Sequence, residues 1–494
     1  MDGVARVREF EATLERLTAD LARLASVAER LQARSVELEK QLEDERAEKL
    51  RAVERVEALE REVKELRGRL AESERAAKRQ AGPFRRRESK KIPKDRQKRP
   101  GNKPGHKGSC RDVPEHVDQE VEVPLNGCPC CGGPVESCRP VEQVIEEIPE
   151  VRPTVTRLVT YVGHCKACGE VQSSHPLQMS TATGAARVQV GPRALALASY
   201  LRSRLGCTVR TTLKILRKVA GLKMSPGGLI QALKRHQGKL KNPYESLIKD
   251  LQKAPATFAD ETGWYVASSH RWLWVFTNAS TTVFRIDAKR DAAVVNDVLG
   301  QDFQGVLVSD CLASYESTDY RRQSCHAHHL REIAALESVP GATTPSYMDR
   351  IKRLLRSVRM FWSIRGQLSP ETYRALCQGI RAELELWASE PCERPGDLKI
   401  RQRLAKRLPT LTACLDEPSA EPTNNRSERE LRYAVIARKL SCGHRTDSGA
   451  EGFAKAASLF RTLEQRGGDP IAWLASLLPR AAPPVPFPSI PSQS

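Results

Sequence analysis

Apolar side chains recur at alternating spacings of three and four residues from Val7 to Leu70, and leucine occupies more than half of these positions. Glutamate and arginine fill most of the positions between them, and no proline interrupts residues 1–77. A heptad pattern of this length is typical of a coiled coil, which we predict over residues 1–77. A long helix that folds back on its own chain is the alternative. We expect the seam to pair with a second copy or a partner, and hence a homo-oligomer.

The periodic pattern ends where residues 78–115 begin, and this segment is rich in Lys, Arg, Pro and Gly. Between Lys78 and Lys107 there are 13 basic and 2 acidic residues, a local charge of +11. Pro and Gly interrupt helices, so the segment reads as a disordered basic linker. It is either a solvated tail or a stretch that contacts phosphates. We expect nucleic-acid binding by its basic residues, notably Arg85, Arg86, Arg87, Lys90, Lys91, Arg99 and Lys103.

Residues 116–180 carry two C-x-x-C pairs, each followed by a glycine that permits a tight turn. The pairs are Cys128 with Cys131 and Cys165 with Cys168. Four thiolates suit tetrahedral Zn²⁺, and residues 142–164 alternate as strands do, so we predict a zinc ribbon with a structural zinc ion. A redox C-x-x-C is the alternative reading, and the surplus Cys130 could compete with its neighbours for the metal.

Short apolar-periodic segments with basic faces and tight turns fill residues 190–250, where we predict helices. This pattern resembles a DNA-binding helix-turn-helix, although a purely structural helical bundle fits it equally well.

From residue 254 the pattern changes to apolar runs of strand length. "TFAD", residues 271–278 and residues 281–287 read as three strands, residues 291–301 as a helix, and "QGVLVSDC" as a fourth strand. This order predicts a ribonuclease H-like α/β core, whose first part spans residues 254–340. Asp260 and Asp310 end their strands and should approach one point. Adjacent side chains on a strand face opposite ways, so Glu261 should not join them.

Two carboxylates brought together repel one another unless a cation lies between them, and oxygen ligands suit Mg²⁺ or Mn²⁺. A third carboxylate is expected from a later helix. Asn424 is a good N-cap for a helix that carries Glu428, while Glu430 should point elsewhere. A solvated surface charge is the ordinary alternative for Glu428.

The remaining segments complete the organisation. Residues 345–418 are strongly helical and interrupt the core, and residues 419–478 form its last part. Residues 479–494 contain six prolines in 16 residues, which predicts a disordered tail.

Composition narrows the class of partner. The 494-residue chain carries 80 Lys and Arg against 61 Asp and Glu, a formal charge of +19. Such a balance indicates a polyanionic partner, with nucleic acid favoured over an anionic membrane. No stretch approaches 20 consecutive apolar residues, and the N-terminal segment has no apolar signal region. We therefore expect no membrane partner and a cytoplasmic location; its assignment to the bacterial nucleoid depends on the resemblance described next.

Several short motifs follow one another through residues 80–478: "PFRRR", "KRPGNKPG", "CPCCGGP", "CKACG", "GPRALALASYLRSRLG", "SPGGL", "ADETGW", "LVSDCLASY", "CHAHHLRE", "PTNNRSERELR" and "IARKLSCGHRT". In this order they resemble the DDE transposases of insertion-sequence family 66. The resemblance implies a catalytic triad of Asp260, Asp310 and Glu428 that binds Mg²⁺ or Mn²⁺, cleaves DNA at the ends of a mobile element and joins the ends to target DNA. It also implies accessory proteins of the same element, and it accounts for the 117 residues between Asp310 and Glu428 as a helical insertion.

Two further points depend on this reading. Arg438 and Lys439, which follow Glu428, become candidate phosphate contacts. Cys325 and His328 form a C-x-x-H pattern that recurs in several transposase groups. Two ligands are too few for a structural zinc ion, so we expect a structural role for this pair. Related members often carry an aromatic residue in place of His326.

Two other functions fit parts of the pattern. The chain could be a non-catalytic DNA-binding regulator or architectural protein whose carboxylates are structural. It could also be a metal-dependent nuclease that never joins strands.

Overall fold

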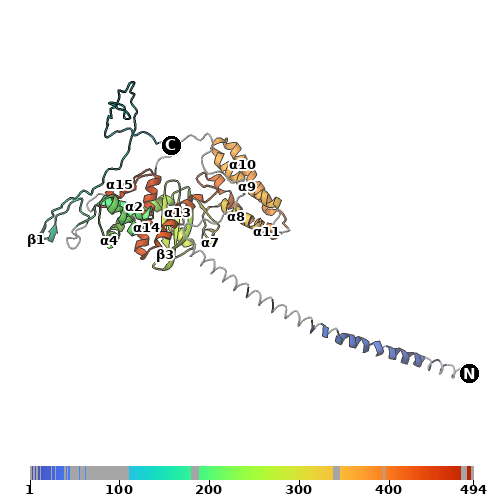
Figure 1. Cartoon of the computed structure of the whole chain (residues 1–494). Helices are drawn as coiled ribbons and strands as arrows, with labels where there is room; N and C mark the ends of the chain where they lie inside the picture. Colours follow the sequence, from blue (N-terminus) through green and yellow to red (C-terminus); the bar gives the residue numbers. More distant parts are fainter. Residues whose placement is uncertain are drawn as a thin grey trace. The chain divides into compact units, whose positions relative to one another are not determined.

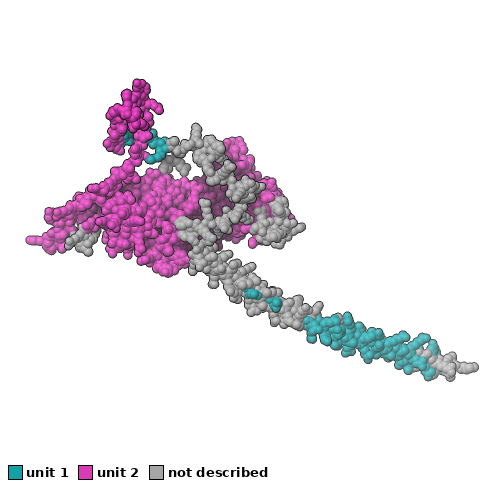
Figure 2. Space-filling view, in the orientation of Figure 1, with its two compact units in different colours: residues 1–117 teal, residues 118–494 magenta. Residues whose placement is uncertain are grey.

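The computed structural model describes residues 111–179, 188–337, 345–392, 395–479 and 487–490, together with isolated positions between residues 3 and 62. The chain divides into two compact units, residues 1–117 and 118–494 (Figure 2). In the first unit the described positions from 3 to 62 are helical, and seam leucines such as Leu14 and Leu31 are exposed. Pairing of this helix stays a prediction. The basic linker residues from Arg85 to Lys103 lie outside the described residues.

A five-stranded mixed sheet forms the centre of the second unit (Figure 1). Its strands are β3 (Ala256–Val266), β4 (Ser269–Thr277), β5 (Thr282–Asp287), β6 (Val306–Ser309) and β7 (Arg322–Ser324), in the order β5-β4-β3-β6-β7. The first three are antiparallel neighbours, and β6 and β7 join in parallel after helix α6 (Ala292–Leu299). The predicted order of three strands, a helix and a strand is therefore observed, with β7 as an addition.

The strands bury side chains on both faces because alternate positions are apolar. On β4, Trp274 and Phe276 belong to one hydrophobic cluster, whereas Leu273 and Val275 belong to another. The first cluster is shared with helices that precede the sheet: α2 (Pro192–Ser203), α3 (Val209–Val219), α4 (Pro226–His236), η2 (Gln237–Leu240) and α5 (Lys241–Gln252). The region predicted to be helical is therefore helical, and it packs on the sheet.

The helices of the insertion share a further cluster with β3 and β6, through Phe258 and Val308. They are α8 (His326–Glu337), α9 (Pro345–Ile364), η3 (Arg365–Gln367), α10 (Pro370–Ser389), α11 (Pro395–Leu411) and α12 (Ala413–Asp416) (Figure 1). The chain enters and leaves this helical segment at neighbouring points, since the backbone amide of His326 donates a hydrogen bond to the Pro422 carbonyl at 2.9 Å.

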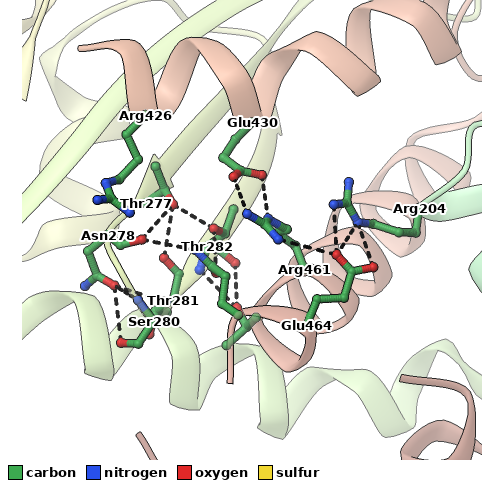
Figure 3. A network of polar contacts seen from close by, with 12 residues as sticks. Arg204, Thr277, Asn278, Ser280, Thr281, Thr282, Arg426, Glu430, Arg461 and Glu464 are labelled. Atoms are coloured by element: carbon green, nitrogen blue, oxygen red, sulfur yellow. Dashed lines mark hydrogen bonds and ion pairs between the residues drawn. The ribbon is translucent and has the colours of Figure 1, made fainter. Parts of the chain in front are cut away.

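The chain ends in α13 (Asn425–Ser441), α14 (Asp447–Gln465) and α15 (Pro470–Leu477). Leu431 and Ala434 of α13 pack in one cluster with Val275. Glu430 points to α14, where Arg461 donates two hydrogen bonds of 2.7 Å to its carboxylate (Figure 3). Glu430 was predicted to point away from Glu428, and it does: its ion pair with Arg461 joins α13 to α14.

Two expectations differ from the structure. Residues 142–161 form no strand, and among the described residues the predicted ribbon contains the hairpin β1 (Val162–Cys165) and β2 (Gly169–Gln172), whose strand pairing begins at Val162 and does not extend into the alternating segment. In the proline-rich tail, Phe487 packs edge-on against Trp473 at 5.2 Å, and Arg466 donates a hydrogen bond to the Pro488 carbonyl at 2.6 Å. One apolar side chain thus anchors residues 487–490, which we expected to be disordered.

Within the part of the chain that the structure describes, no helix has the length and apolar character needed to span a membrane.

Candidate active site

Asp260 lies in the middle of β3 and not at its end, contrary to the expectation. The strand continues to Val266 because β4 pairs with it over nine positions, including Asp260 with Val275. Its other neighbour, β6, pairs only with Ala256–Phe258. At Asp260, β3 is therefore still paired with β4 but no longer with β6. The unpaired edge leaves room for a functional side chain.

Asp310 follows the last residue of β6 on that same open edge. The parallel register pairs Phe258 with Val308, so two residues further along each strand lead to Asp260 and Asp310. Both carboxylates are fastened locally: Asp260 Oδ1 accepts a hydrogen bond from the Glu261 amide at 2.9 Å, and Asp310 Oδ1 accepts one from the Leu312 amide at 3.0 Å. The sheet register alone brings these two aspartates to one edge.

Glu428 lies in the first turn of α13, and its carboxylate accepts a hydrogen bond from Arg331 of α8 at 3.2 Å. Asn424 occupies the N-cap position, but its side chain does not cap the helix. Instead the side-chain amide of Asn424 donates a hydrogen bond to the backbone carbonyl of Ala259 at 2.8 Å. Ala259 is the residue before Asp260. The expected cap residue therefore ties the start of α13 to β3.

The negative charges of Asp310 and Glu428 act on Asp260. The pKa of Asp260 is raised to about 7, mainly because burial disfavours its charged form. The charge of Glu261 adds to the rise, and those of Asp310 and Glu428 contribute further. Repelling carboxylates in a partly buried position are the setting that a divalent cation stabilises.

The residues present fit a hard cation such as Mg²⁺ or Mn²⁺. All three side chains offer oxygen, and the buried Asn424 Oδ1 has no hydrogen-bond partner among the described residues. In the described part of the chain, no three His, Cys, Asp or Glu side chains are already gathered at ligand distance. Arg331 pairs with Oε1 of Glu428, so a metal competes with this ion pair for the charge of the carboxylate.

Glu261 faces away from its neighbour, in keeping with the prediction. Its side chain is 2% exposed and forms an ion pair with Arg290 at 2.7 Å. The Tyr315 hydroxyl donates to its other oxygen at 2.5 Å. These two partners were not identified from the sequence, although Tyr315 lies in the quoted "LVSDCLASY" motif. Glu261 is thus a structural carboxylate beside a candidate catalytic one.

The two candidate phosphate contacts near the end of α13 differ. Arg438 donates hydrogen bonds to Thr262 Oγ1 at 3.2 Å and to the Gly263 carbonyl. A phosphate would have to compete with these bonds to β3. Lys439, the next residue, is exposed.

The cysteine segment forms each of its two turns separately. The Gly132 amide donates to the Cys128 carbonyl at 2.8 Å, and the glycine after each pair adopts positive φ, +74° at Gly132 and +76° at Gly169. Backbone amides of the following residues lower the pKa of Cys128, as they do for Cys165. Each turn thus favours a thiolate, but the described residues do not bring the two pairs into one cluster. The zinc site stays a prediction.

Comparison with known proteins covers this region. The family described as "Transposase IS66 family" matches residues 187–452. The chain is 24% identical over 425 residues to an uncharacterized protein of Sinorhizobium fredii (strain NBRC 101917 / NGR234), y4jD, which covers 76% of this chain and 80% of that protein. A second uncharacterized protein of the same organism, y4qI, is 27% identical over 271 residues, 48% of this chain and 49% of its own length.

The family match includes the sheet, the insertion and the start of α14, and with them Asp260, Asp310 and Glu428. It extends over more than half of the 494 residues. The chain belongs to the IS66 transposase family.

Proposed function

We propose that this protein is a DNA transposase that cleaves the ends of a mobile element and joins them to target DNA, with Asp260, Asp310 and Glu428 as its catalytic carboxylates. The observation that carries the proposal is the register of β3 and β6, which brings the two aspartates to one open edge of the sheet. Family membership supports the activity. The strand order β5-β4-β3-β6-β7, with three antiparallel strands followed by two parallel ones, supports a ribonuclease H-like core.

The roles of the residues follow from their positions. Asp260 and Asp310 provide two oxygen ligands from the sheet, and Glu428 provides a third from the first turn of α13. A bound Mg²⁺ or Mn²⁺ pair supplies charge stabilisation at the scissile phosphate and lowers the pKa of the attacking water or 3′-hydroxyl. Arg331 holds Glu428 in place until the metal competes for it, and Asn424 fixes the start of α13 against β3.

DNA contacts are proposed for the helices before the sheet. Residues 171–244 contain 13 Lys and Arg and no Asp or Glu. Basic side chains are exposed along α3 and α4: Arg210, Lys214, Arg217, Lys218, Lys234 and Arg235. A segment that contributes basic and no acidic side chains to the surface attracts phosphates, which suits a protein that must hold duplex ends.

The outer segments complete the proposal. The leucine seam predicted over residues 1–77, whose described members Leu14, Leu17, Leu21 and Leu31 are exposed, would pair two copies as a coiled coil, so that one assembly holds two element ends. Cys128, Cys131, Cys165 and Cys168 would bind one structural Zn²⁺, and the linker would add sequence-independent phosphate contacts. A protein with this function would act at the bacterial nucleoid, with accessory proteins of the same element.

The test is an assay with the full-length protein, Mg²⁺ and a duplex that carries an end of the element. We expect the wild-type protein to nick the end and to join it to a second duplex. Asp260→Asn, Asp310→Asn and Glu428→Gln should each lower both rates by at least about 10³-fold, because each removes a ligand of the reacting metal. DNA binding should be retained.

Glu451→Gln is the matched control, since Glu451 is a 65% exposed glutamate on α14 that pairs with Lys455. It should leave both rates unchanged. Full strand transfer by Asp260→Asn would overturn the proposal. DNA binding with no Mg²⁺-dependent cleavage would favour a DNA-binding regulator, and cleavage without joining would favour a nuclease.

A further inference from the structure

Cys325 lies at a junction between the segments that carry the three carboxylates. It directly follows β7 and is completely buried. Its amide donates to the Ser309 carbonyl at 2.9 Å, one residue before Asp310. Its sulfur accepts a hydrogen bond from the Asn424 amide at 3.2 Å. One residue thus connects the end of β6, through its backbone amide, with the residue at which α13 begins, through its sulfur.

Asn424 extends this junction to the third carboxylate. Its side-chain amide bonds to the Ala259 carbonyl, which precedes Asp260 on β3. Its own carbonyl accepts hydrogen bonds from the Ser427 hydroxyl at 2.9 Å and from the Glu428 amide at 3.3 Å. A continuous path of hydrogen bonds therefore runs from the residue before Asp310, through Cys325 and Asn424, to Glu428 and to the residue before Asp260.

The ordinary reading of a buried cysteine is that of a small apolar side chain that fills space. That reading does not account for the Asn424 amide. The amide lies at the N-cap position, where helix geometry offers it no partner, and Cys325 Sγ is the acceptor it has. Without the sulfur a buried N–H would be left unsatisfied, and a buried unsatisfied donor drives the backbone to move.

We propose that Cys325 is a positioning residue: by holding the Asn424 amide it keeps the start of α13 in register with β3 and β6, so that Glu428 can complete the metal site begun by Asp260 and Asp310. This inference rests on the proposed function for the identity of the site. It assigns a purpose to the C-x-x-H pattern, whose second member also lies close, since the His328 amide bonds to the Cys325 carbonyl at 3.1 Å.

The test measures metal binding and not only activity. The full-length, zinc-loaded protein is titrated with Mn²⁺, and free Mn²⁺ is followed by electron paramagnetic resonance. The bound Mn²⁺ that is lost in Asp260→Asn, where the free Mn²⁺ signal is higher, defines the site. Cys325→Ala should weaken Mn²⁺ binding there about 10-fold or more, as loss of a residue that orients a ligand does. Cys325→Ser keeps an acceptor and should recover most of the affinity.

Cys377→Ala is the matched control, because Cys377 is a buried cysteine of α10 in the insertion. It removes the same thiol and should leave Mn²⁺ affinity unchanged, even where its thermal stability falls as much as that of Cys325→Ala. Cys325→Val also removes the acceptor but keeps an apolar side chain of similar size, and it should weaken Mn²⁺ binding to a similar extent, which decides the matter should Cys325→Ala fail to fold.

Wild-type Mn²⁺ affinity in a folded Cys325→Ala protein, or in Cys325→Val, would overturn the inference. So would equal weakening in Cys325→Ala and Cys377→Ala, since packing alone would then explain the effect. The outcome is separate from that of the proposed function. If the wild-type protein binds Mn²⁺ at Asp260 but cleaves no DNA, the transposase proposal fails and the inference about Cys325 stands. If Cys325→Ala binds Mn²⁺ as tightly as wild type and is active, the inference fails and the transposase proposal stands.

Discussion

The carboxylate edge of the sheet and the cysteine segment are two candidate metal sites that the fold treats in opposite ways. Asp260 and Asp310 are brought to one edge by backbone pairing, on a sheet whose interior side chains are fully buried. The two cysteine turns form separately, in a segment whose apolar side chains, such as Ile145 and Val155, are exposed. In the sheet, apolar burial brings the metal-binding side chains together. In the cysteine segment, only a bound metal ion could do so.

The difference shows which free energy assembles each site. Burial of the sheet holds repelling carboxylates together and raises the pKa of Asp260, so the site exists at an electrostatic cost before any metal binds. A small segment with no core of its own depends on metal binding for its folding free energy, which is of order 10 kcal/mol for structural zinc. Three measurements sharpen or break this contrast.

The largest effect is expected from the cysteine segment. Replacing Cys131 and Cys168 by serine should lower the zinc content from about one ion per chain to none, because two of four thiolate ligands are lost. Metal analysis of the purified protein gives the result. The unfolding free energy of the core should change by less than about 0.5 kcal/mol, since these residues lie outside its hydrophobic clusters.

Cys130→Ser is the control for this pair, because it removes a cysteine from the same turn that we do not assign as a ligand. It should keep the zinc. Loss of zinc in Cys130→Ser with retention in Cys131→Ser would reassign the first turn, and a core that unfolds with zinc removal would end the contrast between the two regions.

The second effect tests the electrostatic cost at Asp260. Its pKa in the folded protein, about 7, lies above the ordinary value of 3.8. The folded state therefore binds more protons than the unfolded state between pH 4 and 7, and stability is lost as pH rises through that window. In the absence of Mg²⁺, Asp260→Asn should be more stable than wild type at pH 8, by at most about 4 kcal/mol, and equal to it near pH 4.

Denaturant unfolding of the full-length protein at both pH values measures this difference. Asp297→Asn serves as the control, since it makes the same substitution at a 60% exposed aspartate outside the site. A stability difference between Asp260→Asn and wild type that does not change with pH would show that Asp260 carries no raised pKa.

The smallest effect concerns Glu428, the carboxylate of the site that forms an ion pair with Arg331. Arg331→Gln releases Glu428 from its ion pair and should tighten Mn²⁺ binding in the absence of DNA by about two- to fivefold, the size expected for a partly exposed pair. Arg403→Gln breaks a similarly exposed pair with Glu332 on the same helix and should have no effect. Weaker Mn²⁺ binding in Arg331→Gln would mean that Arg331 helps to build the site.

The general course of the chain could be predicted from its pattern because strand and helix periods are local properties. Three strands, a helix and a further strand were readable, as were the helices of residues 190–250 and of the insertion. The length of β3 was not. The polar pair at Asp260 and Glu261 resembles the end of a strand, yet pairing with β4 continues to Val266. Tertiary pairing decides where a strand ends, and polarity alone does not reveal it.

The candidate site was predictable in its acidic residues and not in what holds them. Asn424 has the residue type of an N-cap, but a bond to Ala259 outcompetes the local one, and this partner is 165 residues away. Arg331 stands three residues after His328 in a quoted motif, yet its ion pair with Glu428 depends on how α8 and α13 meet. Long-range partners of this kind leave no periodic signal in the sequence.

The hydrogen bond between His326 and Pro422 has a consequence for how the family can vary. It closes the insertion into a loop whose ends meet beside the site, and the entropy of closing a loop rises by only about 0.6 kcal/mol for each doubling of its length. Evolution can therefore lengthen, shorten or replace the inserted helices at little thermodynamic penalty. What descent must preserve is an apolar surface over Phe258 and Val308, and not any particular number of residues.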